Sequence, residues 1–406
     1  MRLLHTSDWH LGHQLHGVAR DREHAAFLAW LVEVCARERV DAVLITGDVF
    51  DGSNPPAVAQ AAYYGFLAAC AARGTQVIVL GGNHDSAARL EAPAPLLESL
   101  HVRVIGALPR CASDPTCIDW ERAIVRLDGA VVLAMPFLRI GDLAAARLCG
   151  ESSDDPDLAI RTLYKDGVDA ARARMRSGDA LVVTGHLHVS GAEPSVLSER
   201  RIVVGGSEAV AGDLFPADAA YVALGHLHKA QRIAGRDHVR YAGSPIPLSM
   251  GEAGYRHQVV IVDLDGGAVA VRALEIPRSV ELVKIGPAPI EQVIAELTRL
   301  PDLSEDDVHE LRPYLEVHVR LDRPAPALRT QIEQALDGKR PRLVKIGVER
   351  AGDLQALGDA AAGVALADLA PRDVLVRRWR RDHQGEPPAA LIAAFDALVA
   401  QVQQET

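Results

Sequence analysis

The chain has 406 residues, with 43 Lys or Arg against 54 Asp or Glu, so its formal net charge is −11 when its 16 His are counted as neutral. Hydrophobic residues make up 49% and charged residues 24% of the sequence, which is ordinary for a globular protein and excludes the disordered and fibrous classes. The acidic balance excludes a protein that coats nucleic acid by bulk positive charge, but it leaves room for a local basic groove.

The first part of the chain alternates short apolar runs with helical patterns, which is typical of βαβ units around a buried sheet. Strands are predicted at Arg2–Thr6, Ala42–Thr46, Gln76–Leu80, Val131–Met135, Leu181–Thr184 and Tyr221–Leu224, and helices at Arg20–Arg39, Pro55–Arg73 and Ala87–Leu100. Toward its end this part becomes strand-rich. Gln258–Leu264 and Ala268–Ile276 flank Asp265-Gly266-Gly267, which predicts a hairpin.

A second, smaller α/β unit begins near Pro277. Its predicted elements are strands at Glu281–Ile285, Tyr314–Leu321 and Arg342–Val348 and helices at Ile290–Leu300 and Ala325–Leu336. A Gly/Ala-rich linker at 352–363 and two helices, at Pro371–Arg381 and Pro388–Gln403, complete the chain. We therefore predict three regions, at 1–276, 277–350 and 351–406.

The cysteines and the absence of a long apolar run bear on the cellular compartment. There are five Cys, an odd number, and no CxxC motif. This usage predicts reduced thiols in a cytoplasmic protein. Asp8 precedes any long apolar run, which argues against a signal peptide. No apolar stretch of ~18 residues is present, so no membrane span is expected.

Five polar clusters stand out because each follows an apolar strand. They read DWH from Asp8, GDVFD from Gly47, GGNHD from Gly81, GHLH from Gly185 and GHLH from Gly225. In open α/β sheets, ligands bind outside the carboxyl ends of the strands. If these five strand ends are neighbours, their Asp, Asn and His side chains share one crevice.

The residue types in these clusters suit two divalent metal ions. Carboxylate, amide oxygen and imidazole without Cys favour Mn²⁺, Fe or Zn²⁺ over soft metals, and Mg²⁺ remains an alternative. One Asp must bridge two ions that lie ~3.5–4 Å apart, as in two-metal phosphoesterases. His84 lies next to a candidate ligand and is the candidate general acid, although a purely positioning role stays open for it.

Taken together and in this order, the motifs DxH, GDxxD, GNHD, GH and GHxH resemble the calcineurin-like metallophosphoesterase superfamily. The finer resemblance is to the SbcD family of bacterial nuclease subunits. It is carried by LHTSDWHLG from Leu4, TGDVFD from Thr46 and YAGSP from Tyr241. Beyond residue 276 the chain matches that family in layout rather than by motif. The resemblance implies an α/β two-sheet sandwich flanked by helices, with a small α/β capping domain and a C-terminal helical tail.

The resemblance also assigns the site. One metal would be held by Asp8, His10, Asp48 and His228, and the other by Asp48, Asn83, His186 and His226, with Asp48 as the bridge. His84 would act on the leaving group or on the transition-state phosphate, steadied by Asp85. Archaeal and eukaryotic relatives commonly have His where Asp51 stands, so Asp51 could instead orient a ligand. His188 repeats the spacing of His228, and whether it lines the site is left open.

The implied activity is that of a Mn²⁺-dependent DNA nuclease subunit in DNA repair, recombination and replication. In the family it is an endonuclease on single strands and, with the SbcC coiled-coil ATPase and ATP, an exonuclease on duplex ends. The chain has no GxxxxGK[ST] loop, so ATP hydrolysis must come from the partner. The family works as a homodimer, which would use the helices predicted at Pro55–Arg73 and Ala87–Leu100.

Two other functions keep the same fold. A phosphodiesterase acting on a small nucleotide would not need the domain after Pro277, and a non-catalytic scaffold would not need all seven ligands intact. Arg377, Arg378, Arg380 and Arg381 around Trp379 could bind nucleic acid, but a solvated helix face is favoured. The apolar stripe in the tail packs either on the protein's own core or on the coiled coil of the ATPase; it comprises Leu391, Phe395, Leu398 and Val402.

Overall fold

The computed structural model of the chain describes residues 1–139, 141–143, 155–195, 209–265, 268–322 and 325–350, together with scattered residues between 375 and 395. The predicted linker at 352–363 lies outside the described residues, as do Arg377, Arg378 and Arg381. Of the two predicted tail helices, the structure describes only scattered residues. The division into three regions therefore stays a prediction.

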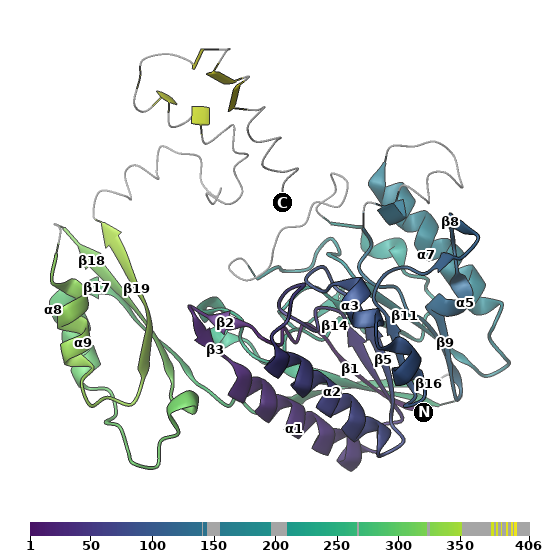
Figure 1. Cartoon of the computed structure of the whole chain (residues 1–406), viewed down its shortest axis with the longest axis horizontal. Helices are drawn as coiled ribbons and strands as arrows, with labels where there is room; N and C mark the ends of the chain where they lie inside the picture. The colour runs from purple at the N-terminus through teal and green to yellow at the C-terminus, as the bar shows by residue number, and fades with distance from the viewer. Residues whose placement is uncertain are drawn as a thin grey trace.

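Two six-stranded mixed sheets form the larger part of the molecule (Figure 1). The first contains, in spatial order, β16 (Ala268–Glu275), β15 (Gln258–Asp265), β1 (Arg2–Thr6), β4 (Ala42–Thr46), β5 (Gln76–Leu80) and β6 (Val102–Ile105). Strands β1, β4, β5 and β6 are parallel, so their carboxyl ends lie along one edge of the sheet. The three strands β1, β4 and β5 have the bounds predicted from the sequence.

The second sheet also contains a run of four parallel strands. Its spatial order is β13 (Gln231–Ile233), β14 (Arg236–Tyr241), β12 (Tyr221–Gly225), β11 (Ala180–His186), β10 (Ala130–Leu133) and β9 (Ile124–Leu127). Strands β10, β11, β12 and β14 are parallel. Two short hairpins lie outside the sheets, β2 (Gln14–Leu15) with β3 (Val18–Ala19) and β7 (Arg110–Cys111) with β8 (Asp114–Ile118).

The two sheets pack face to face, and helices cover both outer faces. Leu44, Val132 and Tyr221 belong to the apolar layer between the sheets. Helices α1 (Asp21–Glu38) and α2 (Ala57–Ala71) pack on the first sheet, and α7 (Pro156–Arg172) packs on the second. The shorter helices are α3 (Ala87–Glu91), α4 (Ala94–Glu98) and α5 (Trp120–Ala123), with 3₁₀ turns η1 (Gly212–Leu214), η2 (Met250–Gly254) and η3 (His309–Leu311). The predicted α/β sandwich is thus confirmed.

Two helices differ from the prediction. The helix predicted at Ala87–Leu100 is divided into α3 and α4 at Pro93, because proline lacks the N–H that a continuous helix needs there. Helix α7 was not predicted, although Asp155 caps its start and Pro156 occupies its first turn.

A separate three-stranded parallel sheet follows residue 277, as the sequence predicted for the small α/β unit. Its strands are β17 (Leu282–Pro289), the central β18 (Tyr314–Leu321) and β19 (Arg342–Arg350). Helices α8 (Ile290–Thr298) and α9 (Leu328–Ala335) cover one face, where Val293, Leu297 and Ile332 are fully buried. Figure 1 shows both helices on the side of this sheet that points away from the larger sheets. We call this three-stranded unit the cap.

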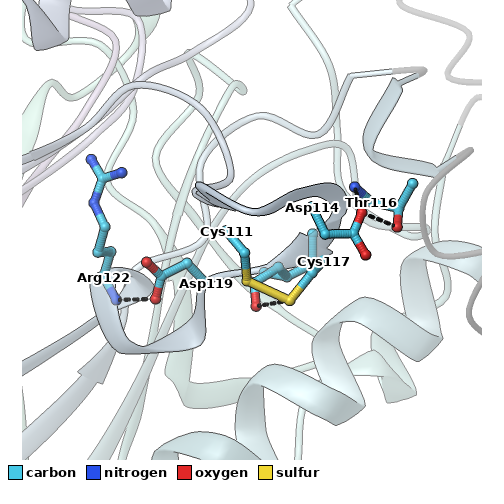
Figure 2. The surroundings of a disulfide bond; sticks show 7 residues. Cys111, Asp114, Thr116, Cys117, Asp119 and Arg122 are labelled. Carbon is cyan, nitrogen blue, oxygen red and sulfur yellow. Dashed lines mark hydrogen bonds between the residues drawn. A yellow bond between two sulfur atoms is a disulfide. The ribbon is translucent and has the colours of Figure 1, made fainter.

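The cysteine prediction is wrong for one pair. Cys111 and Cys117 are joined as a disulfide (Figure 2), because the β7–β8 hairpin brings their Cα atoms to 5.4 Å. Cys35 and Cys70 are free and buried, and Cys149 lies outside the described residues.

Among the residues that the structure describes, no helix has both the length and the apolar character that crossing a membrane would require.

Candidate metal centre

The five polar clusters meet at the edge where the parallel strands of both sheets end. Asp8 and His10 follow β1, Asp48 follows β4 and Asn83 follows β5, while His186 ends β11. His226 and His228 follow β12. The sheets pack on each other with these ends adjacent, so residues more than 200 positions apart come into contact. The main-chain N–H of His226, for example, donates to Asp8 Oδ1 at 2.9 Å.

Three groups of side chains offer ligand atoms within 4.8 Å of one another. They are Asp8 with His10 and His228, His10 with Asp48 and His84, and Asp48 with His186 and His226. Asp48 is central: its Oδ2 lies 3.6 Å from His10 Nε2 and 3.4 Å from His186 Nε2. All the predicted metal-binding side chains are therefore brought together, and Asp48 stands between two halves of the site.

We call Asp8, His10 and His228 the first half-site. Each of them is at least 97% buried. The Nδ1 atom of His10 lies 3.2 Å from Asp51 Oδ1, which is the arrangement expected of a carboxylate that orients a ligand. The Nδ1 atom of His228 lies 3.2 Å from Glu252 Oε1.

We call Asn83, His186 and His226 the second half-site. Asn83 Oδ1 lies 3.0 Å from His186 Nε2 and 3.0 Å from His226 Nδ1. The other ring nitrogen of His186 donates to the main-chain carbonyl of Thr46 at 2.8 Å. An imidazole is thus oriented here by the backbone of β4.

The backbone around the site is strained in ways that put these side chains close together. Asp8, Asp48 and His226 have φ values of 53°, 49° and 101°, which non-glycine residues seldom adopt. A Cβ on Gly47 would lie 2.2 Å from His186 Nδ1, and one on Gly82 would lie 2.1 Å from Asp48 Oδ1. Only glycine permits this approach, and strain of this kind is characteristic of functional sites.

These residues fit a pair of divalent cations. The donors are carboxylate, amide oxygen and imidazole, which suit such ions. His10 Nε2 is buried without a hydrogen-bond partner, which is costly unless a ligand uses it. The adjacent His186 outweighs the effect of burial and holds the pKa of Asp48 far below its usual range, whereas burial raises the pKa of Asp8 to about 7. Opposite shifts in neighbouring carboxyls mark a site of concentrated charge.

The structure changes the expected relation between His84 and Asp85. The Asp85 carboxylate accepts the N–H groups of Val49, Phe50 and Gly82 at 3.1, 3.0 and 2.9 Å. It therefore ties the loop after β4 to the loop after β5 and does not bond the His84 ring. That ring donates from Nδ1 to the main-chain carbonyl of Asp51 at 2.9 Å. The sequence motif showed that the two residues are neighbours but not which way their side chains point.

His188 is partly buried and belongs to none of the three groups found among the described residues. Sequence reasoning missed Glu252 and His13. The imidazole of His13 bonds Asp51 Oδ1 at 3.0 Å and the carbonyl of Leu248 at 2.9 Å. No spacing rule connects these residues with the motifs. The one available signal was an acidic residue, Glu252, within a largely apolar stretch.

Comparison with known proteins agrees with this geometry. The family model described as calcineurin-like phosphoesterase matches residues 1–230. A second model, described as the type 5 capsule protein repressor C-terminal domain, matches residues 277–383.

Three curated relatives are named as the SbcD subunit of the nuclease SbcCD. The protein of Rhodobacter capsulatus is 41% identical, covering 86% of this chain and 88% of its own length. That of Escherichia coli K12 is 36% identical over 75% of this chain and 76% of its own. That of Bacillus subtilis is 39% identical over 66% of this chain and 68% of its own.

Proposed function

The chain belongs to the calcineurin-like phosphoesterases and, within them, to the SbcD family of SbcCD nucleases; from this premise we propose that it is a metal-dependent nuclease subunit that hydrolyses DNA phosphodiesters. The observation that carries the proposal is the position of Asp48, whose carboxylate lies within 4 Å of His10 in one group of ligands and of His186 in another. A single carboxylate between two groups of imidazoles is what a two-metal phosphoesterase requires.

Two divalent ions, Mn²⁺ first among the candidates, would occupy the site. The first half-site and Asp48 would hold one ion, and the second half-site and Asp48 would hold the other. Bound there, the ions would supply Lewis acidity at the phosphate and an activated water. Asp85 contributes by fixing the loops after β4 and β5, which carry Asp48 and Asn83.

His84 would protonate the leaving oxygen or contact the phosphate. Its ring packs edge-on to His10, with ring centroids 4.7 Å apart, so it borders the first half-site. Because Nδ1–H donates to the carbonyl of Asp51, Nε2 is the nitrogen left to exchange a proton with a substrate. General acid catalysis of this kind typically contributes ~10²–10⁴-fold to a rate.

The substrate, the partner, the cellular location and the oligomeric state are proposed from membership of the family. We infer DNA as the substrate, an SbcC-like coiled-coil ATPase as the partner and the cytoplasm as the location. A homodimer would use the helices after β4 and β5, where Val58 of α2 and Leu96 of α4 are 51% and 75% exposed. The cap would help to hold duplex DNA, and the helical tail would dock on the ATPase.

The test is cleavage of labelled single-stranded and duplex DNA by the purified chain with Mn²⁺. The assay is run with and without the ATPase and ATP, and the Asp48→Ala variant serves as the inactive reference. We expect Mn²⁺-dependent cuts in single strands by the chain alone and ATP-dependent degradation of duplex ends with the partner. Cleavage of model phosphodiesters without any cleavage of DNA would favour the small-nucleotide phosphodiesterase, and no hydrolysis at all would favour the scaffold.

A further inference from the structure

A buried carboxylate beside the first half-site has no place in the motifs. Glu252 lies in the 3₁₀ turn η2 and is 1% exposed. A carboxylate that is removed from water in this way is tolerated only when its oxygens are bonded. Its bonds therefore indicate what the side chain does.

The two oxygens of Glu252 serve two different groups. Oε1 lies 3.2 Å from Nδ1 of His228, and Oε2 accepts the N–H of Leu248 at 2.7 Å. The carboxylate thus spans from an imidazole of the first half-site to the peptide that precedes its own turn.

The contact with Glu252 selects one form of the His228 ring. In a neutral imidazole one nitrogen donates and the other accepts. Because the carboxylate accepts a hydrogen bond from Nδ1–H, the lone pair of the neutral ring is on Nε2, the nitrogen that would act as a ligand together with Asp8 and His10. A second hydrogen bond of this kind fixes both the tautomer and the plane of a metal-binding histidine.

The same peptide also leads to the other imidazole of the first half-site. The carbonyl of Leu248 accepts from His13 Nε2 at 2.9 Å, and His13 Nδ1 lies 3.0 Å from Asp51 Oδ1. Asp51 in turn bonds His10 Nδ1. His10 and His228 are therefore both connected to Leu248, each through a carboxylate.

This segment also lies against the junction with the cap. The carbonyl of Pro247 accepts from Arg20 Nη1 at 2.7 Å, and Arg20 is ion-paired with Glu23. The Tyr314 hydroxyl in β18 donates to Glu23 Oε1 at 2.8 Å. Met250 and Tyr314 share one small buried apolar cluster.

We propose that Glu252 is a positioning residue of the first half-site: it orients His228 for a divalent cation and, through Leu248, joins that imidazole to the junction between the larger sheets and the cap. The proposal rests on the metal centre assigned under the proposed function. It goes further by separating the two ions, because it makes only the first depend on Glu252.

Calorimetric titration of the full chain with Mn²⁺ tests the proposal. Wild type is compared with Glu252→Gln, which removes one acceptor at nearly constant volume, and with Glu252→Asp, which keeps the charge and shortens the reach. Glu193→Gln is the matched control, since the Glu193 side chain is 73% exposed and pairs with Lys229 next to His228. Melting temperatures without metal show whether each variant folds.

We expect Glu193→Gln to bind two Mn²⁺ ions with the same two affinities as wild type. In each Glu252 variant the affinity for one ion should fall by about 10–100-fold, and the affinity for the other should stay unchanged. Wild-type affinities in both folded Glu252 variants would overturn the proposal. Loss in Glu252→Gln with full affinity in Glu252→Asp would also overturn it, because charge alone would then suffice. Failure of wild type to bind two ions would contradict the proposed metal centre itself.

Discussion

The two half-sites hold their imidazoles by different means. In the first, His10 and His228 are oriented by the carboxylates of Asp51 and Glu252. In the second, His186 is oriented by the main-chain carbonyl of Thr46, the last residue of β4. One half therefore depends on side chains that substitution can remove, whereas the other depends on the backbone of a central strand.

This difference separates what is rigid in the site from what is adjustable. The carbonyl of Thr46 is fixed by the parallel pairing of β4 with β1 and β5. The supports of the first half-site lead instead to the loop at 247–252 and to the junction with the cap. The first half-site is therefore connected to the junction with the cap, whereas the second is supported within a central strand.

The largest effect is expected where the half-sites meet. Asp48→Ala removes the only carboxylate proposed to contact both ions, so titration should show that Mn²⁺ binding at both half-sites is lost or severely weakened, together with DNA cleavage. Asp128→Ala, in an exposed turn before β10, is the matched control and should behave as wild type. Full binding of two ions by Asp48→Ala would show that the half-sites are independent.

Removing the candidate acid should leave both half-sites intact. His84→Ala should bind two Mn²⁺ with unchanged affinity, yet single-strand cleavage should fall by about 10²–10⁴-fold because proton transfer is lost. Asp128→Ala, in the exposed turn before β10, is again the control. Undiminished cleavage would remove His84 from the mechanism.

Removing a carboxylate support should affect one half-site only. Asp51→Ala frees the Nδ1 atom of His10, so the affinity for one Mn²⁺ should fall by about 10–100-fold while the other is retained. The measurement is the same calorimetric titration, with Asp128→Ala again as control. An equal fall in the affinity for both ions would contradict the distinction between side-chain support and backbone support.

A side-chain change at Thr46 should lower the stability of the protein without weakening either half-site. Thr46→Val removes the hydroxyl that bonds His5 Nε2 at 3.0 Å but keeps the carbonyl that bonds His186. Chemical denaturation should show a loss of about 1–3 kcal/mol in the free energy of unfolding, because His5 is left without this partner in the core. The affinity for both Mn²⁺ ions should be unchanged. A lower affinity at the second half-site would contradict the claim that the main-chain carbonyl of Thr46 orients His186.

The smallest effect is expected at the cap junction. Tyr314→Phe keeps the ring and removes the hydrogen bond to Glu23, so the free energy of unfolding should fall by about 1 kcal/mol. Any change in Mn²⁺ affinity should be confined to the first half-site. Tyr64→Phe, on the exposed side of α2, is the control. A change confined to the second half-site would contradict the connection through Leu248.

Much of the fold and the ring of predicted ligands could be read from the sequence. Strands such as Ala42–Thr46 are continuous apolar runs that end in Gly and a polar residue, so both the strand and the position of its functional end are visible. The sequence predicted one shared crevice only on the condition that the five strand ends are neighbours, and in the structure they are. A short apolar run that is bounded by turn residues fits a fully buried strand.

The supports of the ligands were not visible in the sequence. Glu252 and His13 act on residues that are 24 and 38 positions away, and His13 also bonds a carbonyl 235 positions away. Such contacts depend on how loops return over the sheet edge, which no local pattern encodes. The Cys111–Cys117 pairing and the orientation of Asp85 escaped prediction for the same reason, because each depends on the path of a turn.

The central claim is that two cations share Asp48 between two half-sites that are supported differently. The most direct measurement is anomalous scattering from Mn²⁺-soaked crystals of wild type and Glu252→Gln. Wild type should show two peaks, one beside His10 and His228 and one beside His186 and His226, with Asp48 between them. In Glu252→Gln at limiting Mn²⁺ the first peak should weaken and the second should persist. A single peak in wild type, or equal loss of both peaks in the variant, would contradict the account.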